Sequence, residues 1–438
     1  MKLYLDYKKL FNNILFIVLM LGFYFFPPLR WIAGEAFSFA QTASEIQNKI
    51  NQKDSDIQKL EQEIVTYQSE LDSLGKQKNS LAKSLKELDL MRKKLNADIG
   101  VTQNKIDKTN LKIQNLSSDI NTKENSIENN LDSIRLQIKN INELEENSLI
   151  ENILSLNDFT DIWNDIDSMM TVRERIRIDV IKLKQIKGVL EDTKKITIDT
   201  KNELTKLRSQ LSDQQKIVVQ NTNEKNKLLK QTKNNEVNYQ KLLKDRITKR
   251  DAFEKELRDY EAQLQFILDP SKLPSGRVLS WPLEKVYVTQ LFGKTVDSKR
   301  LYASGTHNGV DFRASIGTPV LAMADGKVLG IGDTDLVCFG ASFGKFVFIE
   351  FNNGLSNTFG HLSLIKTYEG EQVKRGDIIG YSGNTGHSTG PHLHVSLYAS
   401  QAVKMASKTS IACGGRIYRL PVSPINAYLN VLSYLPAL

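Results

Sequence analysis

Residues 85–113 read LKELDLMRKKLNADIGVTQNKIDKTNLKI, and this stretch decides the fold of the first half of the chain. Every seventh residue is apolar with one exception, in the series Leu85, Arg92, Ile99, Ile106 and Ile113. The series extends outward from Ile57 to Ile141, and a companion series three residues on runs from Leu60 to Leu95. An apolar stripe with a 3.5-residue period predicts a coiled coil.

The heptads lapse in the middle of this region and then resume. Between residues 146 and 170 the sequence is too apolar and aromatic for a simple seam, with Phe159 and Trp163 among its members, and weaker heptads return from Ile176 to Val218. We therefore expect residues 41–269 to form an antiparallel helical hairpin with an apolar tip near 147–170. Each arm would have on the order of 100 residues, about 150 Å. A passive rod and a parallel homodimer remain alternatives.

Composition limits the classes of partner. The chain has 438 residues and a formal net charge of +8, but its lysines alternate with acidic residues in the helical repeats. They do not form a basic stripe interleaved with aromatic residues, so we expect no nucleic acid partner. A weak attraction to anionic polymers of the cell envelope fits this charge equally well.

Residues 1–40 have the pattern of an export signal. Lys2, Lys8 and Lys9 precede an apolar run over residues 14–26, which is short for a membrane span. Small residues in Ser38-Phe39-Ala40 offer a cleavage site. This pattern predicts an exported protein, periplasmic or at the cell surface, whose N-terminal segment is either cleaved or kept as a membrane anchor.

The two cysteines, Cys338 and Cys413, lie in glycine-containing stretches of the second half of the chain. Export would place them in a compartment that permits disulfides. A Cys338–Cys413 disulfide is the favoured prediction, and two free thiols are the alternative. Neither cysteine has the CxxC spacing of a zinc or redox site.

Residues 270–438 have a different composition. Glycine, proline and β-branched residues replace the helical repeats, and short apolar runs alternate with turns such as Asn353-Gly354. This pattern predicts a compact, all-β, antiparallel domain after the coiled coil. The whole chain is thus expected to be an α + β multidomain protein.

All five histidines fall between His307 and His394, and four of them lie in three segments that suggest a metal site. His307 precedes Asp311 in an HxxxD motif, His361 lies in a second segment, and His392 and His394 form an HLH. On a strand, residues i and i+2 face the same side, so both HLH imidazoles would enter one pocket.

Catalytic zinc takes three nitrogen or oxygen ligands and keeps a fourth position open for water, whose pKa it lowers to about 7. His307, Asp311 and one HLH histidine supply such a set. The other HLH histidine and His361 could then carry protons and donate to the oxyanion.

Residues 280–432 resemble the lysostaphin/LytM-type zinc endopeptidases that cleave peptidoglycan. The matching stretches are Trp281-Pro282, HNGVD from His307, GTPVLAMADGKV, FGHLS around His361, VKRGDIIGYSGNTG and STGPHLH. The resemblance implies a split-barrel or sandwich-like domain with zinc ligands His307, Asp311 and His394 and the catalytic pair His361 and His392. His387 falls in a turn and is interpreted as an exposed rim residue.

Some positions depart from the family pattern. Val395-Ser396 follow the HLH where many relatives have an aromatic residue and a glutamate, so a contact that orients a ligand is expected to be missing. Insertions near residues 333–343 and 401–420 each carry one cysteine, and a disulfide between them would join loops near the groove.

The helical region is more loosely similar to the EnvC-type murein hydrolase activators, including Leu154-Ser155-Leu156-Asn157-Asp158-Phe159. Taken together, these resemblances predict a zinc peptidase, in particular a D,D-endopeptidase acting on peptidoglycan during wall remodelling or division. The coiled coil would regulate it, either by covering the enzyme or by docking a membrane-bound division or transporter partner at its tip. The alternative is a non-catalytic activator of cell-wall amidases.

Overall fold

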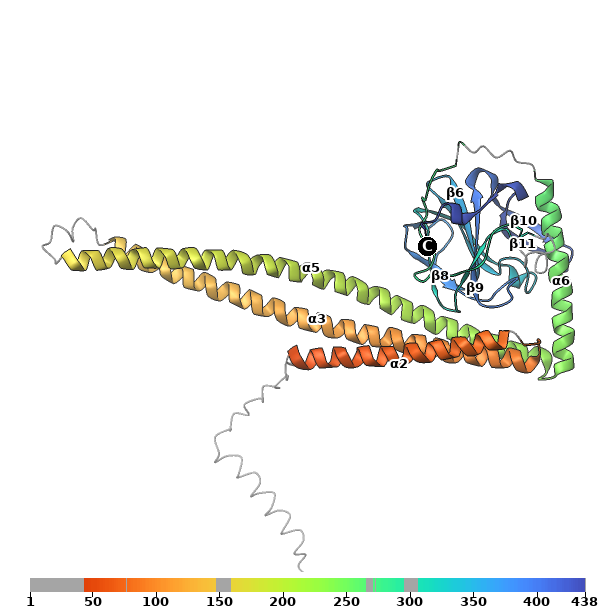
Figure 1. Cartoon of the computed structure of the whole chain (residues 1–438), viewed down its shortest axis with the longest axis horizontal. Helices are drawn as coiled ribbons and strands as arrows, with labels where there is room; N and C mark the ends of the chain where they lie inside the picture. Colours follow the sequence, from red (N-terminus) through yellow and green to blue (C-terminus); the bar gives the residue numbers. More distant parts are fainter. Residues whose placement is uncertain are drawn as a thin grey trace, which may run out of the picture.

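The computed structural model describes residues 43–75, 77–146, 159–264, 271, 273–294 and 306–437. A helical part precedes a β-domain, as Figure 1 shows. The N-terminal segment 1–40 and residues 147–158 of the expected tip lie outside the described residues. The helices are α2 (Ala43–Gly75), α3 (Leu81–Glu146), α5 (Phe159–Thr232) and α6 (Glu236–Gln263).

The long arms are α3 and α5, which run side by side in opposite directions, while α2 packs along α3 (Figure 1). Heptad residues such as Leu95, Ile106 and Leu204 are buried in this bundle. The arms have 66 and 74 residues, shorter than the sequence led us to expect. The difference arises because the helices are interrupted at both ends of this region, so that α2 and α6 are separate from the long arms.

The break before α6 sets the position of that helix. Lys233 and Asn234 have φ angles of 50° and 53°, a left-handed conformation that ends α5. The side chain of Asn235 then accepts hydrogen bonds from the backbone N–H groups of Val237 and Asn238 and caps α6. The helix leaves the coiled coil and stands against the β-domain (Figure 1).

The β-domain is antiparallel throughout its described strands, which confirms the expected fold class. Its main sheet has the path β1-β2-β9-β6-β5-β4-β7, with β12 paired to β9 and β8 joining β3 to β6. The strands of this sheet are β1 (Val288–Gln290), β2 (Val310–Arg313), β3 (Pro319–Leu321), β4 (Gly326–Asp333), β5 (Lys345–Phe351), β6 (Leu355–Ile365), β7 (Gln372–Val373), β8 (Ile378–Ser382), β9 (His392–Ala399) and β12 (Tyr428–Leu429).

A separate hairpin of β10 (Lys404–Ser410) and β11 (Arg416–Val422) occupies the second expected insertion. A disulfide joins Cys413 at its turn to Cys338, as the sequence predicted. Both cysteines are buried in a core cluster that also contains Phe253 and Leu257 of α6. The hairpin and the disulfide therefore form part of the surface on which α6 lies.

The β-domain also contacts the base of the coiled coil. The hydroxyl of Tyr381 donates to Asp213 of α5 at 3.1 Å, and Lys366 forms an ion pair with the same carboxylate at 3.1 Å. Leu95 and Ile217 of the arms pack against Tyr381. The domain is thus seated in the angle between the arms and α6 (Figure 1). Among the described helices, none combines the length and the apolar character needed to cross a membrane.

Candidate metal centre

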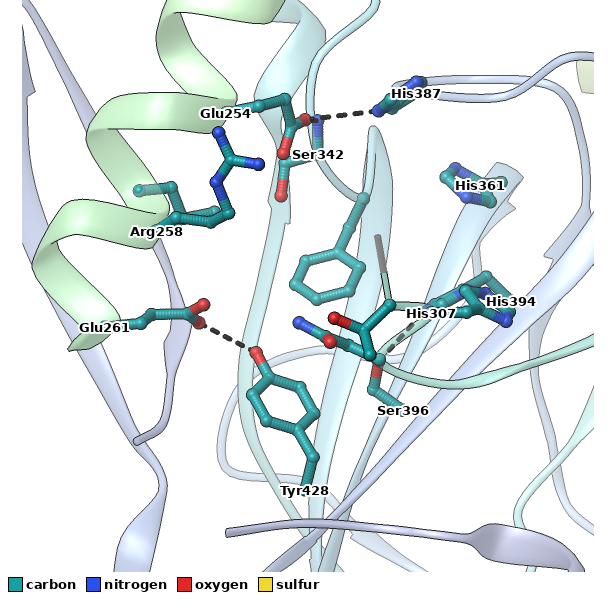
Figure 2. Close-up of a pocket in the computed structure, with 14 residues that line it drawn as sticks. Glu254, Arg258, Glu261, His307, Ser342, His361, His387, His394, Ser396 and Tyr428 are labelled. Carbon is teal, nitrogen blue, oxygen red and sulfur yellow. Dashed lines mark hydrogen bonds and ion pairs between the residues drawn. The ribbon is translucent and has the colours of Figure 1, made fainter. Parts of the chain in front are cut away.

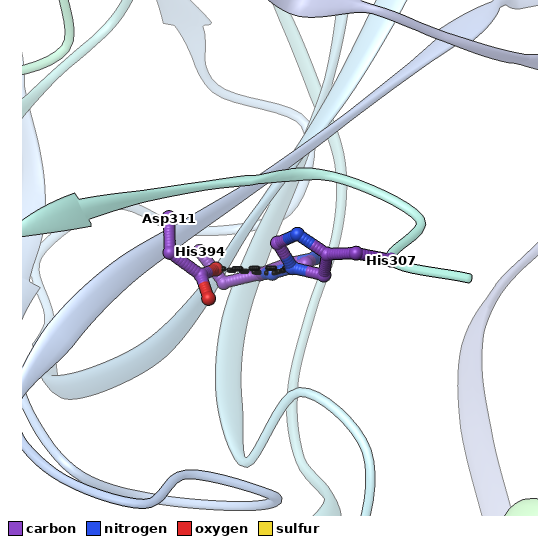
Figure 3. A group of neighbouring side chains, drawn as sticks. All are labelled: His307, Asp311 and His394. Atoms are coloured by element: carbon purple, nitrogen blue, oxygen red, sulfur yellow. Dashed lines mark hydrogen bonds and ion pairs between the residues drawn. The ribbon is translucent and has the colours of Figure 1, made fainter. Parts of the chain in front are cut away.

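Three neighbouring strands bring the HxxxD and HLH motifs together. Asp311 on β2 is the cross-strand partner of His394 on β9, and His394 is also paired with Gly360 on β6. His307 lies just before β2 and forms an isolated bridge with Gly293. The main-chain ladder therefore fixes the positions from which the side chains in Figure 3 converge.

The donor atoms of His307, Asp311 and His394 form a tight, buried cluster. Asp311 Oδ1 lies 2.8 Å from His394 Nδ1 and 3.2 Å from His307 Nε2, and the two nitrogens are 3.1 Å apart. Zinc ligands about 2.0–2.1 Å from the ion at tetrahedral angles would be about 3.3 Å apart. The residues present thus fit a zinc ion.

The tautomer of His307 is set by the backbone. Its Nδ1 lies 3.0 Å from the carbonyl oxygen of Leu291, so Nδ1–H donates there and Nε2 faces Asp311 with its lone pair. Gly309 makes room for the other imidazole, because a Cβ at this position would lie 2.6 Å from Cε1 of His394. A side chain there would displace the His394 ring.

His394 receives its orientation from Ser396, which corrects the expectation of a missing contact. The Ser396 hydroxyl oxygen lies 2.8 Å from His394 Nε2, and the serine is fully buried. When Nε2–H donates to Ser396, Nδ1 is left as the ligand atom facing Asp311. The sequence had marked Ser396 as a departure, but a two-residue spacing alone did not reveal that the hydroxyl reaches the ring.

His361 occupies a strained position on β6. Its φ of 60° lies in the left-handed region, at an irregularity in the pairing of β6 with its neighbours. Its backbone N–H donates to the carbonyl of Phe343 at 2.7 Å, and Nδ1–H donates to the carbonyl of Thr385 at 2.7 Å. These contacts hold the Nε2 lone pair in a defined place.

His392 lies beside His361, with ring centroids 4.7 Å apart. Its Nδ1–H donates to the carbonyl of Gly390 at 2.7 Å, and its Nε2 is 3.6 Å from Asp311 Oδ1. All five predicted site residues are therefore assembled in one place. The fifth histidine, His387, lies on the rim of the same pocket.

Burial and hydrogen bonding act in opposite directions on the charges of this cluster. Burial raises the pKa of Asp311, but its interactions with the neighbouring imidazoles of His307, His394 and His392 outweigh burial and hold the pKa well below its usual range. Burial, followed by the nearby His392, lowers the pKa of His361 well below its usual value. Burial also lowers the pKa of His394. The result is an ionised Asp311 beside a neutral His394, the protonation state in which these two residues bind a metal ion.

Sequence reasoning missed one wall of this pocket. Glu254, Arg258 and Glu261 of α6 line it together with the histidines (Figure 2). The sequence analysis gave covering of the enzyme as one way in which the helical region would regulate it, but it identified no helical residue at the pocket. No periodicity in α6 distinguishes these side chains from those of a solvated helix, so the sequence alone could not identify them.

Comparison with known proteins agrees with this geometry. Peptidase family M23 matches residues 305–405. Peptidoglycan DD-endopeptidase ShyA of Vibrio cholerae is 40% identical over 105 residues, which are 24% of this chain and 23% of that protein. Lysostaphin of Staphylococcus staphylolyticus is 43% identical over 91 residues, which are 20% of this chain and 18% of that protein.

A solved structure gives a similar match. The catalytic domain of lysostaphin from Staphylococcus simulans is 35% identical, with 26% of this chain covering 81% of that one and a TM-score of 0.23. The chain spans about a third or less of the length of the curated relatives it matches. The C-terminal part of the chain thus contains an M23-type peptidase domain, preceded by a long helical region, and its His307, Asp311 and His394 site is intact.

Proposed function

We propose that the chain is a zinc-dependent endopeptidase that hydrolyses peptide cross-links of bacterial peptidoglycan, in particular as a D,D-endopeptidase. The observation that carries this proposal is the convergence of His307, Asp311 and His394 beside the pair His361 and His392. The relatives that match this domain include a peptidoglycan DD-endopeptidase.

Each of these side chains has a separate task in the proposed reaction. His307 Nε2, Asp311 Oδ1 and His394 Nδ1 would hold zinc, which lowers the pKa of water and polarises the scissile carbonyl. His361 and His392, each held by Nδ1–H donation to a backbone carbonyl, keep an Nε2 lone pair available for a proton. Once protonated, either imidazole can donate a hydrogen bond to the oxyanion or a proton to the leaving amine.

The location of the protein is part of this proposal. Its substrate class lies outside the cytoplasm, and the Cys338–Cys413 disulfide is suited to an oxidising compartment. We propose export directed by residues 1–40, as a cleaved signal or as a membrane anchor, and regulation by the helices of residues 41–269. A division or transporter partner at the coiled-coil tip belongs to the same proposal.

The test measures release of soluble fragments from purified peptidoglycan. It compares the full chain with a chain that begins at Lys272, each stripped of metal and then reloaded with zinc. Zinc-dependent release is expected, and His361→Ala should reduce it by about 10²–10⁴-fold. Zinc content and circular dichroism of the variant serve as controls. A folded, zinc-loaded protein that releases nothing would contradict the peptidase proposal, and candidate amidases would then be added to test the activator function.

A further inference from the structure

Helix α6 lies across one wall of the catalytic pocket. Glu254, Arg258 and Glu261 project from it toward the side on which His307, His361 and His394 converge (Figure 2). A peptide substrate must reach the same histidines to be cut. The helix therefore occupies space beside the site that the substrate also needs.

Apolar and polar contacts seat α6 at this wall. Phe253 is fully buried, and its ring meets that of Tyr418 edge-on with centroids 4.9 Å apart. The carboxylate of Glu256 accepts hydrogen bonds from the Ser410 hydroxyl and the Ala412 backbone N–H, both at 2.7 Å. These contacts lie on the β10–β11 hairpin, apart from the pocket, so the seat of α6 can be weakened without changing the catalytic groups.

Glu254 contacts the pocket itself. Its Oε1 accepts a hydrogen bond from the backbone N–H of Ser342 at 2.6 Å and lies 3.6 Å from Nδ1 of His387 (Figure 2). Ser342 and His387 are held next to each other, because the backbone N–H of His387 donates to the carbonyl of Ser342 at 2.8 Å. Glu254 Oε1 thus contacts two groups of the β-domain, the Ser342 N–H through a hydrogen bond and the His387 ring through an ion-pair contact.

The backbone around Ser342 is shaped for this contact. Ser342 has a φ of 50°, an unusual conformation for a residue with a side chain. The carbonyl of the next residue, Phe343, accepts the backbone N–H of His361. The group that receives Glu254 is therefore one residue away from the main chain that positions a predicted catalytic histidine.

We propose that the Ser342 N–H and His387 form a carboxylate-binding position of the substrate groove, and that Glu254 fills it so that α6 competes with the peptide substrate. This inference rests on the proposed function, since it assigns a substrate contact to the same groove. Peptides of the cell wall carry free carboxylates, and a charge-assisted hydrogen bond from a fixed N–H is a strong and directional contact. Because α6 belongs to the same chain, its effective concentration at the groove is high.

The first experiment measures binding in a His361→Ala background, so that turnover does not interfere. The probe is a set of soluble cross-linked peptidoglycan fragments, used either with free carboxylates or after amidation of their carboxyl groups. Glu254→Ala should tighten binding of the carboxylate fragments by about tenfold and leave the amidated fragments much less affected. Asp259→Ala is the matched control, because Asp259 is an exposed acidic residue of the same helix and should change nothing.

Two further variants separate competition from loss of structure. Glu254→Gln keeps the size of the side chain and an acceptor for the Ser342 N–H but removes the charge, so a smaller gain is expected. Glu256→Ala weakens the seat of α6 outside the pocket and should also tighten binding. Circular dichroism of each variant shows whether α6 still forms.

Replacing His387 tests the carboxylate-binding position by changing the group on the β-domain instead of Glu254. In the Glu254→Ala chain, His387→Ala should remove the preference for carboxylate over amidated fragments while zinc content stays unchanged. Equal gains for both fragment types after Glu254→Ala would make Glu254 a simple steric obstacle and overturn the carboxylate assignment. No gain from either Glu254 variant would overturn the whole inference.

The proposed function fails differently. If the Glu254→Ala chain with His361 intact gains binding as expected yet releases no fragments with zinc present, the peptidase proposal is contradicted and the carboxylate-binding position stands. If fragments are released equally by wild type and Glu254→Ala, with equal affinities, the peptidase stands and the competition by α6 is refuted.

Discussion

The floor and the wall of the catalytic groove are built by different kinds of interaction. On the floor, main-chain ladders pair His394 with Asp311 on one side and with Gly360 on the other. The wall is α6, which meets the β-domain through side chains, including the buried Phe253 and the carboxylates of Glu254 and Glu261. Removing the wall would break side-chain contacts and no strand pairing. The metal site is thus part of the sheet, whereas its cover is an added element.

The largest expected effect concerns the floor. His392→Ala removes one of the two imidazoles proposed to handle protons, so the rate of fragment release should fall by about 10²–10⁴-fold. Zinc content should stay close to that of wild type, because His392 is outside the three-donor cluster. Metal analysis and steady-state rates measure both quantities. A variant that loses its zinc together with its activity would show that His392 belongs to the ligand set.

The next prediction concerns the wall and its dependence on pH. Burial raises the pKa of Glu261 to about 7 from 4.5, although Tyr428 donates to its carboxylate. Between these two values the unfolded chain has lost the proton and the folded chain still holds it, so stability decreases as pH rises and the decrease is complete above about 7. The shift corresponds to about 3 kcal/mol.

Glu261→Gln keeps an acceptor for Tyr428 and removes the ionisation. The variant should therefore be more stable than wild type at pH 8, by up to about 3 kcal/mol, and equal to it near pH 4. Thermal unfolding at both pH values measures the difference. Asp259→Asn, at an exposed position of the same helix, serves as the control. A pH-independent difference between Glu261→Gln and wild type would disprove the linkage.

A smaller effect is expected when the orientation of a ligand is disturbed. Ser396→Ala removes the partner of His394 Nε2 and should weaken zinc binding by about 10–100-fold without unfolding the sheet. Competition with a chromogenic chelator measures the affinity. Ser407→Ala, an exposed serine on β10, is the matched control. Unchanged zinc affinity in Ser396→Ala would mean that the Asp311 contact alone orients the ring.

The smallest effect is expected on the outer surface, away from both floor and wall. Arg419 forms a bidentate ion pair with Glu369, with N···O distances of 2.7 and 2.8 Å, but both side chains are more than two-fifths exposed. Arg419→Ala should therefore change the free energy of unfolding by no more than about 1 kcal/mol. Chemical denaturation measures this change, and a much larger loss would indicate that the pair supports the β11 strand through packing.

The sequence predicted the floor better than the wall for a physical reason. Ligand spacing within HNGVD and HLH is local, and strand alternation turns it directly into geometry, so the sequence could bring His307, Asp311, His392 and His394 to one pocket, where the structure also has them. The contact between Glu254 and Ser342 joins residues 88 apart through one side chain and one backbone N–H, and no local pattern reveals such a pair. Ser396 is an intermediate case. The sequence marked this position as unusual, but its hydrogen bond with His394 could be recognised only once the orientation of the His394 ring was known.

In the helical part, too, a local sequence pattern predicted some features and missed others. Heptads predicted long paired helices, because the burial of an apolar stripe repeats along the sequence. They did not predict where α5 ends, since Lys233 and Asn234 adopt left-handed conformations without glycine or proline to signal them. Asn235 caps α6 in the structure, but an asparagine within a lysine- and asparagine-rich region is a weak signal for the start of a helix.

The Cys338–Cys413 disulfide gives the domain a particular covalent topology. It closes a ring with a sequence separation of 75 residues. His361, His392 and His394 lie inside that ring, and His307 and Asp311 lie outside it on the N-terminal side. A loop of this size lowers the entropy of the unfolded chain by an amount equivalent to about 4 kcal/mol. Reduction would therefore lower the free energy of unfolding of the β-domain, and the site, whose ligands lie on both sides of the closure, would lose stability with it.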